Sequence, residues 1–229
     1  MNNPYSNSWK PQDVKEAIYQ IAPRFTDDEK GFWESGKRDA ERMLSYCSLF
    51  NRSIIVDYGC GIGRVLRYMK GAIRVGVDAS EEMLRIAFRE WAGERNDVVL
   101  ARTQDGVSIP LKDGEATFVY SLITLQHMDY DDTERVCLDI SRVLCKSGEA
   151  YLSFSSFGKI EAQRGATISR DDIEWTGDKE NSRFSPNQVL RYSKERLDEL
   201  AKKMSFEKYS IVNGGGTQEF PYIAIYGRK

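Results

Sequence analysis

Three glycines and a carboxylate come together in the stretch VDYGCGIGR, residues 56 to 64, where Asp57 directly precedes the glycines. The apolar run SIIV in front of them predicts a buried strand, and VLRYMK behind them predicts a helix. Glycine adopts positive φ without steric cost and lets another molecule approach the backbone closely. The spacing therefore indicates a tight loop between a strand and a helix, against which a flat ligand can lie.

Other side chains that could do chemistry follow later strands of the chain. Asp78 closes the apolar run AIRVGVD, and Asp105 begins a D-G pair after the run VVLAR. His127, the single histidine, follows the run ATFVYSLITL. Ligands of open α/β folds bind at the carboxyl ends of the strands, which is where these side chains are expected.

The elements that must position these residues alternate along the chain. Strands are predicted over 72–80, 98–102, 116–125 and 150–154, and in FEKYSIV and YIAIYG near the end. Helices are predicted in front of the glycine loop, after Ser80, after Asp131 and from Ser193, with Ser80 and Asp131 as N-caps. Strands that read as continuous apolar runs between helices predict a parallel sheet covered on both faces. The fold class is therefore α/β.

Length and composition favour one domain and exclude some classes of partner. The 229 residues, 41% of them hydrophobic, suit a single domain over 1–229. A formal net charge of −2 without a Lys/Arg-dense stripe argues against a nucleic-acid surface. No run reaches membrane-spanning length, so we expect a cytoplasmic protein. The four cysteines lack C-x-x-C pairing, so no metal is expected, and Cys47 and Cys137 are predicted core residues.

A dinucleotide is the first candidate ligand for the glycine loop. Its fingerprint, G-x-G-x-x-G, stands at this same turn from strand to helix. Read from Gly59, the third glycine is replaced by Arg64, and read from Gly61 it is replaced by Leu66. The glycine that lets helix and strand pack closely beside a pyrophosphate is therefore missing, which argues against this ligand.

Five motifs follow one another in order between residues 53 and 155. D-x-G-C-G-x-G precedes G-V-D, and Q-D-G with I-P follows over 104–110; VYSLITLQHM and RVLCKSGE complete the series. In this order the chain resembles the class I, Rossmann-like S-adenosylmethionine-dependent methyltransferases. The resemblance implies a transferase with a three-layer sandwich around a seven-stranded, mostly parallel sheet, a helical N-terminal extension and an insertion after strand five.

The resemblance also implies S-adenosyl-L-methionine as the cofactor and a set of residues that bind it. These are the acids and glycines of the motifs with their neighbours: Asp57, Gly59, Gly61, Gly63, Asp78, Ala79, Met83, Asp105, Gly106 and Ser121. Ser121, at the end of strand four, is expected near the methionine moiety.

Each acid has its own expected role. Asp78 would accept hydrogen bonds from both ribose hydroxyls, and Asp57 would receive the ammonium group, directly or through water. Asp105 would accept from the exocyclic amine of adenine, although D-G pairs are also ordinary turn chemistry. Ala79 and Met83 would flank the adenine, a position for which a core methionine is the alternative. No metal ligand is implied.

The acceptor side is less defined by the sequence. His127 is the candidate catalytic base, with a role in merely fixing its loop as the alternative. We expect residues 1–50 to form an N-terminal helical lid, in which Trp33 closes over the methionine end, and 155–192 to form a substrate-side insertion. Tyr58 would either contact the sulfonium or face outward. Strand four lacks the acid that many relatives carry and the N-P-P-Y tetrad of base-methylating enzymes.

Three functional hypotheses remain at this point. The favoured one is methylation of oxygen or nitrogen on a small-molecule acceptor. The second is methylation of RNA or protein, which requires a docking surface that the balanced charge does not indicate. The third is a catalytically silent cofactor-binding partner subunit, against which the intact set of acids argues.

Overall fold

A computed structural model describes most of the chain. It covers residues 3, 5, 8–46, 54–156, 173–176, 189–216 and 221–229, and for 173–176, 189, 213–216 and 221–223 it describes the backbone alone. The predicted core residue Cys47 lies outside these ranges, whereas Cys137 is fully buried, as predicted.

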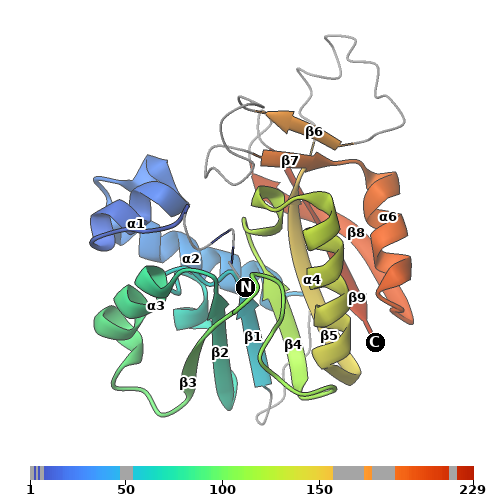
Figure 1. Cartoon of the computed structure of the whole chain (residues 1–229), viewed down its shortest axis with the longest axis horizontal. Coiled ribbons are helices and arrows are strands. Elements are labelled where there is room, and N and C mark those ends of the chain that lie inside the picture. Colours follow the sequence, from blue (N-terminus) through green and yellow to red (C-terminus); the bar gives the residue numbers. More distant parts are fainter. Residues whose placement is uncertain are drawn as a thin grey trace.

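Two helices precede the first strand, after which strands and helices alternate (Figure 1). The helices are α1 (Val14–Ile21), α2 (Glu29–Leu44), α3 (Glu81–Ala87), α4 (Tyr130–Val143) and α6 (Lys194–Lys203). Short helical turns are η2 (Pro23–Phe25), η3 (Leu66–Tyr68), η4 (Phe88–Ala92) and η5 (Leu125–His127). The strands are β1 (Ile54–Tyr58), β2 (Ile73–Asp78), β3 (Val98–Arg102), β4 (Ala116–Ser121), β5 (Leu144–Ser155), β6 (Ile173–Thr176), β7 (Val189–Tyr192), β8 (Lys208–Gly216) and β9 (Pro221–Arg228).

One sheet holds these strands. Its central part runs β3-β2-β1-β4-β5-β9-β8, in which β9 pairs antiparallel with both neighbours and the other contacts are parallel. The β6–β7 hairpin joins beside the end of β5, where Ser155 pairs with Arg191. The predicted α/β class and the mostly parallel, seven-stranded sheet are therefore confirmed. Because β1, β2 and β4 are parallel, their carboxyl ends meet at one edge, which brings Asp57 and Asp78 together.

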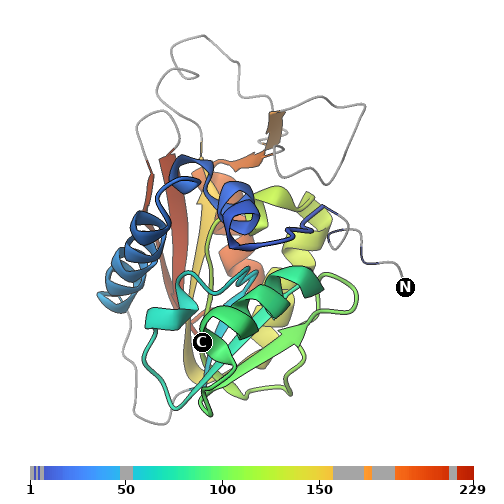
Figure 2. The ribbon, with the colours of Figure 1, turned by 90° about the vertical axis from the view of Figure 1, so that its left-hand side faces the viewer.

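Side-chain alternation along the strands builds the two outer layers. Ile55 and Phe118 pack with α2 and η3 on one face of the sheet, while Val56 and Val119 pack with α4 and α6 on the other. Figure 2 shows α2 and α4 on opposite sides of the sheet. Burial of apolar side chains on both faces explains why these strands read as continuous apolar runs.

The helix caps show which local predictions were right. Ser80 and Ser193 cap α3 and α6 through their hydroxyl oxygens. The predicted cap Asp131 is wrong, because the Asp129 carboxylate accepts from the backbone N–H of Asp132 and α4 begins at Tyr130. Asp131 lies inside the first turn instead, where a negative charge favours the helix dipole.

Two predicted elements are shorter than expected. VLRYMK forms only the turn η3, because the buried Arg74 guanidinium donates to the carbonyls of Leu66 and Arg67 and Met69 is extended. Strand β4 ends at Ser121 rather than at residue 125, because Ile123 has a φ of 60°, which interrupts the strand.

Within the described ranges, no helix is long and apolar enough to cross a membrane. The same residues contain no group of three or more His, Cys, Asp or Glu side chains placed to hold a metal ion.

Helix α2 packs directly against the backbone of the glycine loop. A Cβ added at Gly36 would lie 2.0 Å from the carbonyl oxygen of Arg64, so nothing larger than glycine fits here. We expect Gly36→Ala to lower the free energy of unfolding by about 1–3 kcal/mol, because the helix must move outward. Urea unfolding measures this, with Lys37→Ala at the exposed neighbouring position as the control. If Gly36→Ala is as stable as Lys37→Ala, or more stable, the close contact is contradicted.

Candidate active site

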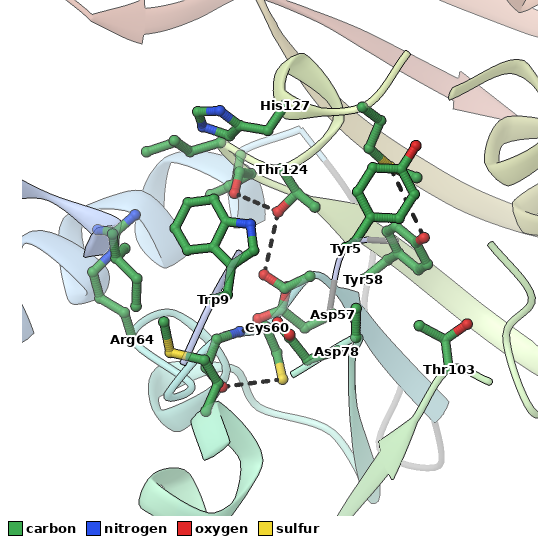
Figure 3. A pocket seen from close by; sticks show the side chains of 18 of the residues that line it. Tyr5, Trp9, Asp57, Tyr58, Cys60, Arg64, Asp78, Thr103, Thr124 and His127 are labelled. Atoms are coloured by element: carbon green, nitrogen blue, oxygen red, sulfur yellow. Dashed lines mark hydrogen bonds between the residues drawn. The ribbon is translucent and has the colours of Figure 1, made fainter. Parts of the chain in front are cut away.

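A cavity lies where the carboxyl ends of β1, β2 and β4 meet the start of the chain (Figure 3). We define the N-terminal strap as the described residues 3, 5 and 8–12. The space inside the cavity and across its open mouth, solvent included, is about 940 Å³. Its lining residues are Tyr5, Trp9, Ile21, Asp57, Tyr58, Gly59, Cys60, Gly61, Arg64, Val65, Asp78, Ala79, Met83, Thr103, Gly106, Leu122, Ile123, Thr124, His127 and Met128.

The glycine loop forms one wall of the cavity. The backbone N–H groups of Gly59 and Cys60 donate to the carbonyl of Val77 at 2.7 and 3.1 Å, which holds the loop on β2. Gly59 has a φ of 75°, and a Cβ there would lie 2.2 Å from the Thr124 side chain. Only glycine meets both conditions, so the loop keeps its backbone open toward the cavity.

Asp78 is held by backbone donors at the end of β2. Its Oδ2 accepts from the N–H of Gly61 and its Oδ1 from the N–H of Ser80, both at 2.8 Å. Burial raises the pKa of this carboxyl, and the two N–H donors work against that rise. A carboxylate offers about four acceptor positions. The remaining ones are available to hydroxyl donors in the cavity.

Asp57 and Arg64 lie at another part of the cavity wall. Asp57 is buried and accepts from the Tyr120 hydroxyl at 2.9 Å. Burial raises the pKa of Asp57 to about 7, against the opposing effects of the Tyr120 hydrogen bond and of Arg64. The guanidinium of Arg64 donates to the Asp39 carboxylate at 2.7 Å, which anchors it to α2. A buried acid and a buried guanidinium beside one cavity suit a ligand that carries both an ammonium and a carboxylate.

Three predicted cofactor residues do not line the cavity. The carboxylate of Asp105 accepts from the N–H groups of Val107 and Ser108 at 2.9 and 2.8 Å, within its own loop. Burial favours a higher pKa for Asp105, but these hydrogen bonds outweigh it and hold the pKa well below its usual range. The hydroxyl of Ser121 donates to the carbonyl of Tyr58, and Gly63 faces the indole of Trp91. The structure brings the other predicted residues together.

The N-terminal strap covers the cavity beside Thr103 and Gly106. The Asn3 amide donates to the carbonyl of Thr103 at 2.9 Å, and the Tyr5 hydroxyl donates to the Asp132 carboxylate at 2.6 Å. The Ser80 hydroxyl donates to the carbonyl of Trp9. The aromatic residues of the predicted lid were the sequence signal for this cover, but the sequence did not indicate which elements they contact.

Trp33 does not line the cavity, contrary to the expectation for the methionine end. Its indole packs edge-on against Phe32 and its Nε1 donates to the Glu29 carboxylate. Tyr58 faces inward instead of outward, and its hydroxyl donates to the carbonyl of Gly106 at 2.6 Å. Tyr58 therefore ties β1 to the loop after β3.

His127 lines the cavity at the side opposite Asp57 and Asp78 (Figure 3). It closes η5, and the Trp9 ring stands edge-on to the imidazole with 5.5 Å between the ring centroids. Its Nε2 lies 3.4 Å from the Nε2 of Gln126. The imidazole is thus placed on the rim of the cavity, and its role as a base stays a prediction.

The segment after β4 holds a strained residue. Ile123, with a φ of 60°, is β-branched and lies in the left-handed region, an arrangement that costs on the order of 1–3 kcal/mol. The Thr124 hydroxyl lies 3.2 Å from the carbonyl oxygens of both Gly59 and Leu122 and shares its one hydrogen between them. These contacts fix the segment across the glycine loop.

The chain has the fold of the class I S-adenosylmethionine-dependent methyltransferases. Residues 56–152 match the methyltransferase domain family, which supports an S-adenosylmethionine-dependent methyltransferase. It is 26% identical over 178 residues to a malonyl-[acyl-carrier protein] O-methyltransferase of Pectobacterium atrosepticum, a match that spans 77% of this chain and 66% of that protein.

Solved structures share the fold. A phosphoethanolamine N-methyltransferase 2 of Haemonchus contortus, in complex with phosphomonomethylethanolamine and S-adenosylhomocysteine, is 16% identical with a TM-score of 0.67, over 98% of this chain and 60% of that one. An S-adenosylmethionine-dependent methyltransferase of Thermotoga maritima is 22% identical with a TM-score of 0.58. The match covers 92% of this chain and 99% of that one.

The raised pKa of Asp57 predicts how stability depends on pH. The folded protein binds this proton more tightly than the unfolded chain, so its stability falls as the pH rises from about 4 to 7, by up to about 4 kcal/mol. Asp57→Asn removes this titration and keeps an acceptor for Tyr120. Urea unfolding without ligand gives the free energy of unfolding of both proteins. The value for Asp57→Asn minus that for the wild type should therefore grow from pH 5 to pH 7 and level off above pH 8. A difference that stays constant over this range would contradict the assignment.

Proposed function

We propose that this methyltransferase transfers the methyl group of S-adenosylmethionine to an oxygen or nitrogen of a small-molecule acceptor. The observation that carries the cofactor part is the Asp78 carboxylate, fixed by two backbone donors and open to the cavity. Its spare acceptor positions fit the two ribose hydroxyls of the cofactor.

The adenine would lie between Tyr5 and the side chains of Ala79 and Met83. These three residues line the cavity, as do Thr103 and Gly106. Asp105 acts here by shaping its loop, since its carboxylate already accepts several hydrogen bonds from that loop. The adenine amine would therefore meet the Thr103–Gly106 backbone and not the Asp105 carboxylate.

The methionine portion would lie over Gly59 and Gly61. Asp57 would accept from its ammonium group, and the guanidinium of Arg64 would face its carboxylate. Binding of an ammonium favours the ionised form of Asp57, so part of the cost of burying that charge is offset when the ligand arrives.

The chemistry that S-adenosylmethionine supplies is an electrophilic methyl group on a sulfonium, whose bond to sulfur breaks as the acceptor's lone pair forms the new bond to carbon. The chain aligns the two reactants and keeps water out, through Tyr5 and Trp9 on one side and the glycine loop on the other. His127 takes the proton that an oxygen or nitrogen acceptor loses.

A small acceptor is supported by the lining of the cavity. Besides the glycine loop and the acids, this lining includes the apolar side chains of Trp9, Leu122 and Ile123, together with Thr124 and His127. The names of two relatives refer to malonyl-[acyl-carrier protein] as the substrate of an O-methyltransferase and to phosphoethanolamine as the substrate of an N-methyltransferase. The malonyl and phosphoethanolamine groups are both compact.

Ligand-induced stabilisation tests the cofactor. S-adenosylmethionine and S-adenosylhomocysteine should raise the melting temperature and NAD should not, because a ligand that binds only the folded state stabilises it. Asp78→Ala should abolish this response, since two hydrogen bonds to a charged group contribute about 1.5–3 kcal/mol each. Asp113→Ala, an exposed acid in front of β4, is the control that keeps the response. A shift with NAD alone, or an unchanged response in Asp78→Ala, would overturn the proposal.

Incubation with labelled S-adenosylmethionine and a metabolite extract tests the acceptor. A labelled small molecule supports the proposal, whereas label only in RNA or protein, or in nothing, contradicts it. With the acceptor found, His127→Asn should lower kcat by about 10²–10⁴-fold. The fall in rate that the wild type shows in acid should disappear in this variant, while its melting-temperature response to S-adenosylhomocysteine stays as in the wild type. A purely structural histidine would instead leave the shape of the pH profile unchanged.

A further inference from the structure

Ile123 carries a backbone conformation that its side chain disfavours. Among the described residues, three other than glycine have positive φ: Ile123, Ser147 and Ser205. Of these, Ile123 alone is β-branched, and a glycine would adopt the same backbone without the clash of its Cβ. The geometry of the turn therefore does not explain why this position carries an isoleucine.

Core packing does not supply that explanation. Leu122 packs into the apolar cluster beneath α2, and Leu125 packs into the cluster beneath α4 and α6. Ile123 belongs to none of the three apolar clusters found in the described part of the chain. It is half-buried and lines the cavity, so its apolar surface faces the site.

Neighbouring contacts prevent Ile123 from relaxing. The hydroxyl of the next residue, Thr124, lies 3.2 Å from the carbonyl oxygen of Leu122, which precedes Ile123, and 3.2 Å from that of Gly59 in the glycine loop. The Thr124 side chain also occupies the space that a Cβ on Gly59 would need. A change in the backbone at Ile123 would therefore displace the glycine loop.

The position of Ile123 relative to the two acids indicates what it faces. On the proposed function, on which this inference rests, the ribose lies on Asp78 and the amino-acid end on Asp57, so the sulfur lies between them over Gly59. The methyl group then points from the glycine loop into the cavity that Ile123 and His127 also line.

We propose that Ile123 is a positioning and specificity residue for methyl transfer. Its side chain limits the space around the transferred group and guides the acceptor onto the line between the methyl carbon and sulfur. The apolar wall of Trp9, Leu122 and Ile123 suits an acceptor that presents its nucleophile on an apolar or aromatic group.

Binding measurements test this without knowledge of the acceptor. The probes are S-adenosylmethionine, S-adenosylhomocysteine and an analogue with an allyl group in place of the methyl, and calorimetry gives their Kd values. The wild type should bind the allyl analogue at least about tenfold more weakly than S-adenosylmethionine, because it overfills the space at Ile123. In Ile123→Ala and Ile123→Gly, the ratio of the Kd of the allyl analogue to that of S-adenosylmethionine should fall at least about fivefold. In Ile123→Val this ratio should stay as in the wild type. The Kd of S-adenosylhomocysteine should change little in all three variants.

Met83→Ala, at the adenine end, is the matched control and should weaken all three ligands by a similar factor. The role of Ile123 would be overturned if the Kd ratio of the allyl analogue to S-adenosylmethionine stayed unchanged in Ile123→Ala and Ile123→Gly. It would also be overturned if this ratio fell in Met83→Ala as well.

Either result leaves the proposed function standing, because the wild type still binds the cofactor. Failure of the wild type to bind either adenosyl ligand would instead overturn the proposed function and this inference with it. Ile123→Gly keeps the left-handed backbone favourable, so it remains informative if the alanine variant folds poorly.

Discussion

The hydrogen bonds from Gly61 and Ser80 to the Asp78 carboxylate join the three parts on which the site depends. One donor comes from the glycine loop after β1 and the other from the start of α3, while the acid itself ends β2. A rearrangement of any of the three would leave a partly buried carboxylate without its donors, which is costly. The acid therefore fixes the loop, and the loop in turn fixes the acid toward the cavity.

Charge burial explains the rest of the site. Asp57 is buried, which raises the cost of ionising it, and the charge of Asp78 raises this cost further, while Tyr120 and Arg64 reduce it. Arg64 itself is held by Asp39 and by the hydroxyl of Ser35, both on α2. Helix α2 thus affects the electrostatics of the cavity, because it holds the guanidinium of Arg64 in the glycine loop. On the proposed function, the ammonium group of the ligand gives Asp57 an opposite charge nearby, whereas Arg64 already has one in Asp39.

Those features that depend on local sequence could be predicted, and those that depend on distant contacts could not. The glycine loop, Asp78, the cap Ser80 and the start of the last helix near Ser193 follow from residues a few positions apart. Asp105 was placed in the cavity by resemblance, but the N–H groups of its own loop compete for the carboxylate. The shortening of VLRYMK to η3 depends on Arg74, which comes from the next strand.

The lid was predicted as a region but not in its detail. Which aromatic residues reach the cavity depends on bonds from the strap to Thr103, Asp132 and Ser80, each about 70 or more positions away. Arg64 lines the cavity but was not among the predicted site residues, although it stands where a dinucleotide site would have its third glycine. The left-handed backbone at Ile123 had no sequence signal, because isoleucine is the kind of residue least expected there.

The close approach of Gly36 to the carbonyl of Arg64 has a mechanical consequence. With no side chain between them, α2 and the glycine loop touch backbone to backbone, and two such surfaces cannot slide without one lifting off the other. Relative motion of the two is therefore costly. A hinge within the described N-terminal residues is thus expected in front of Glu29, on the side of the strap and α1, while α2 stays with the glycine loop.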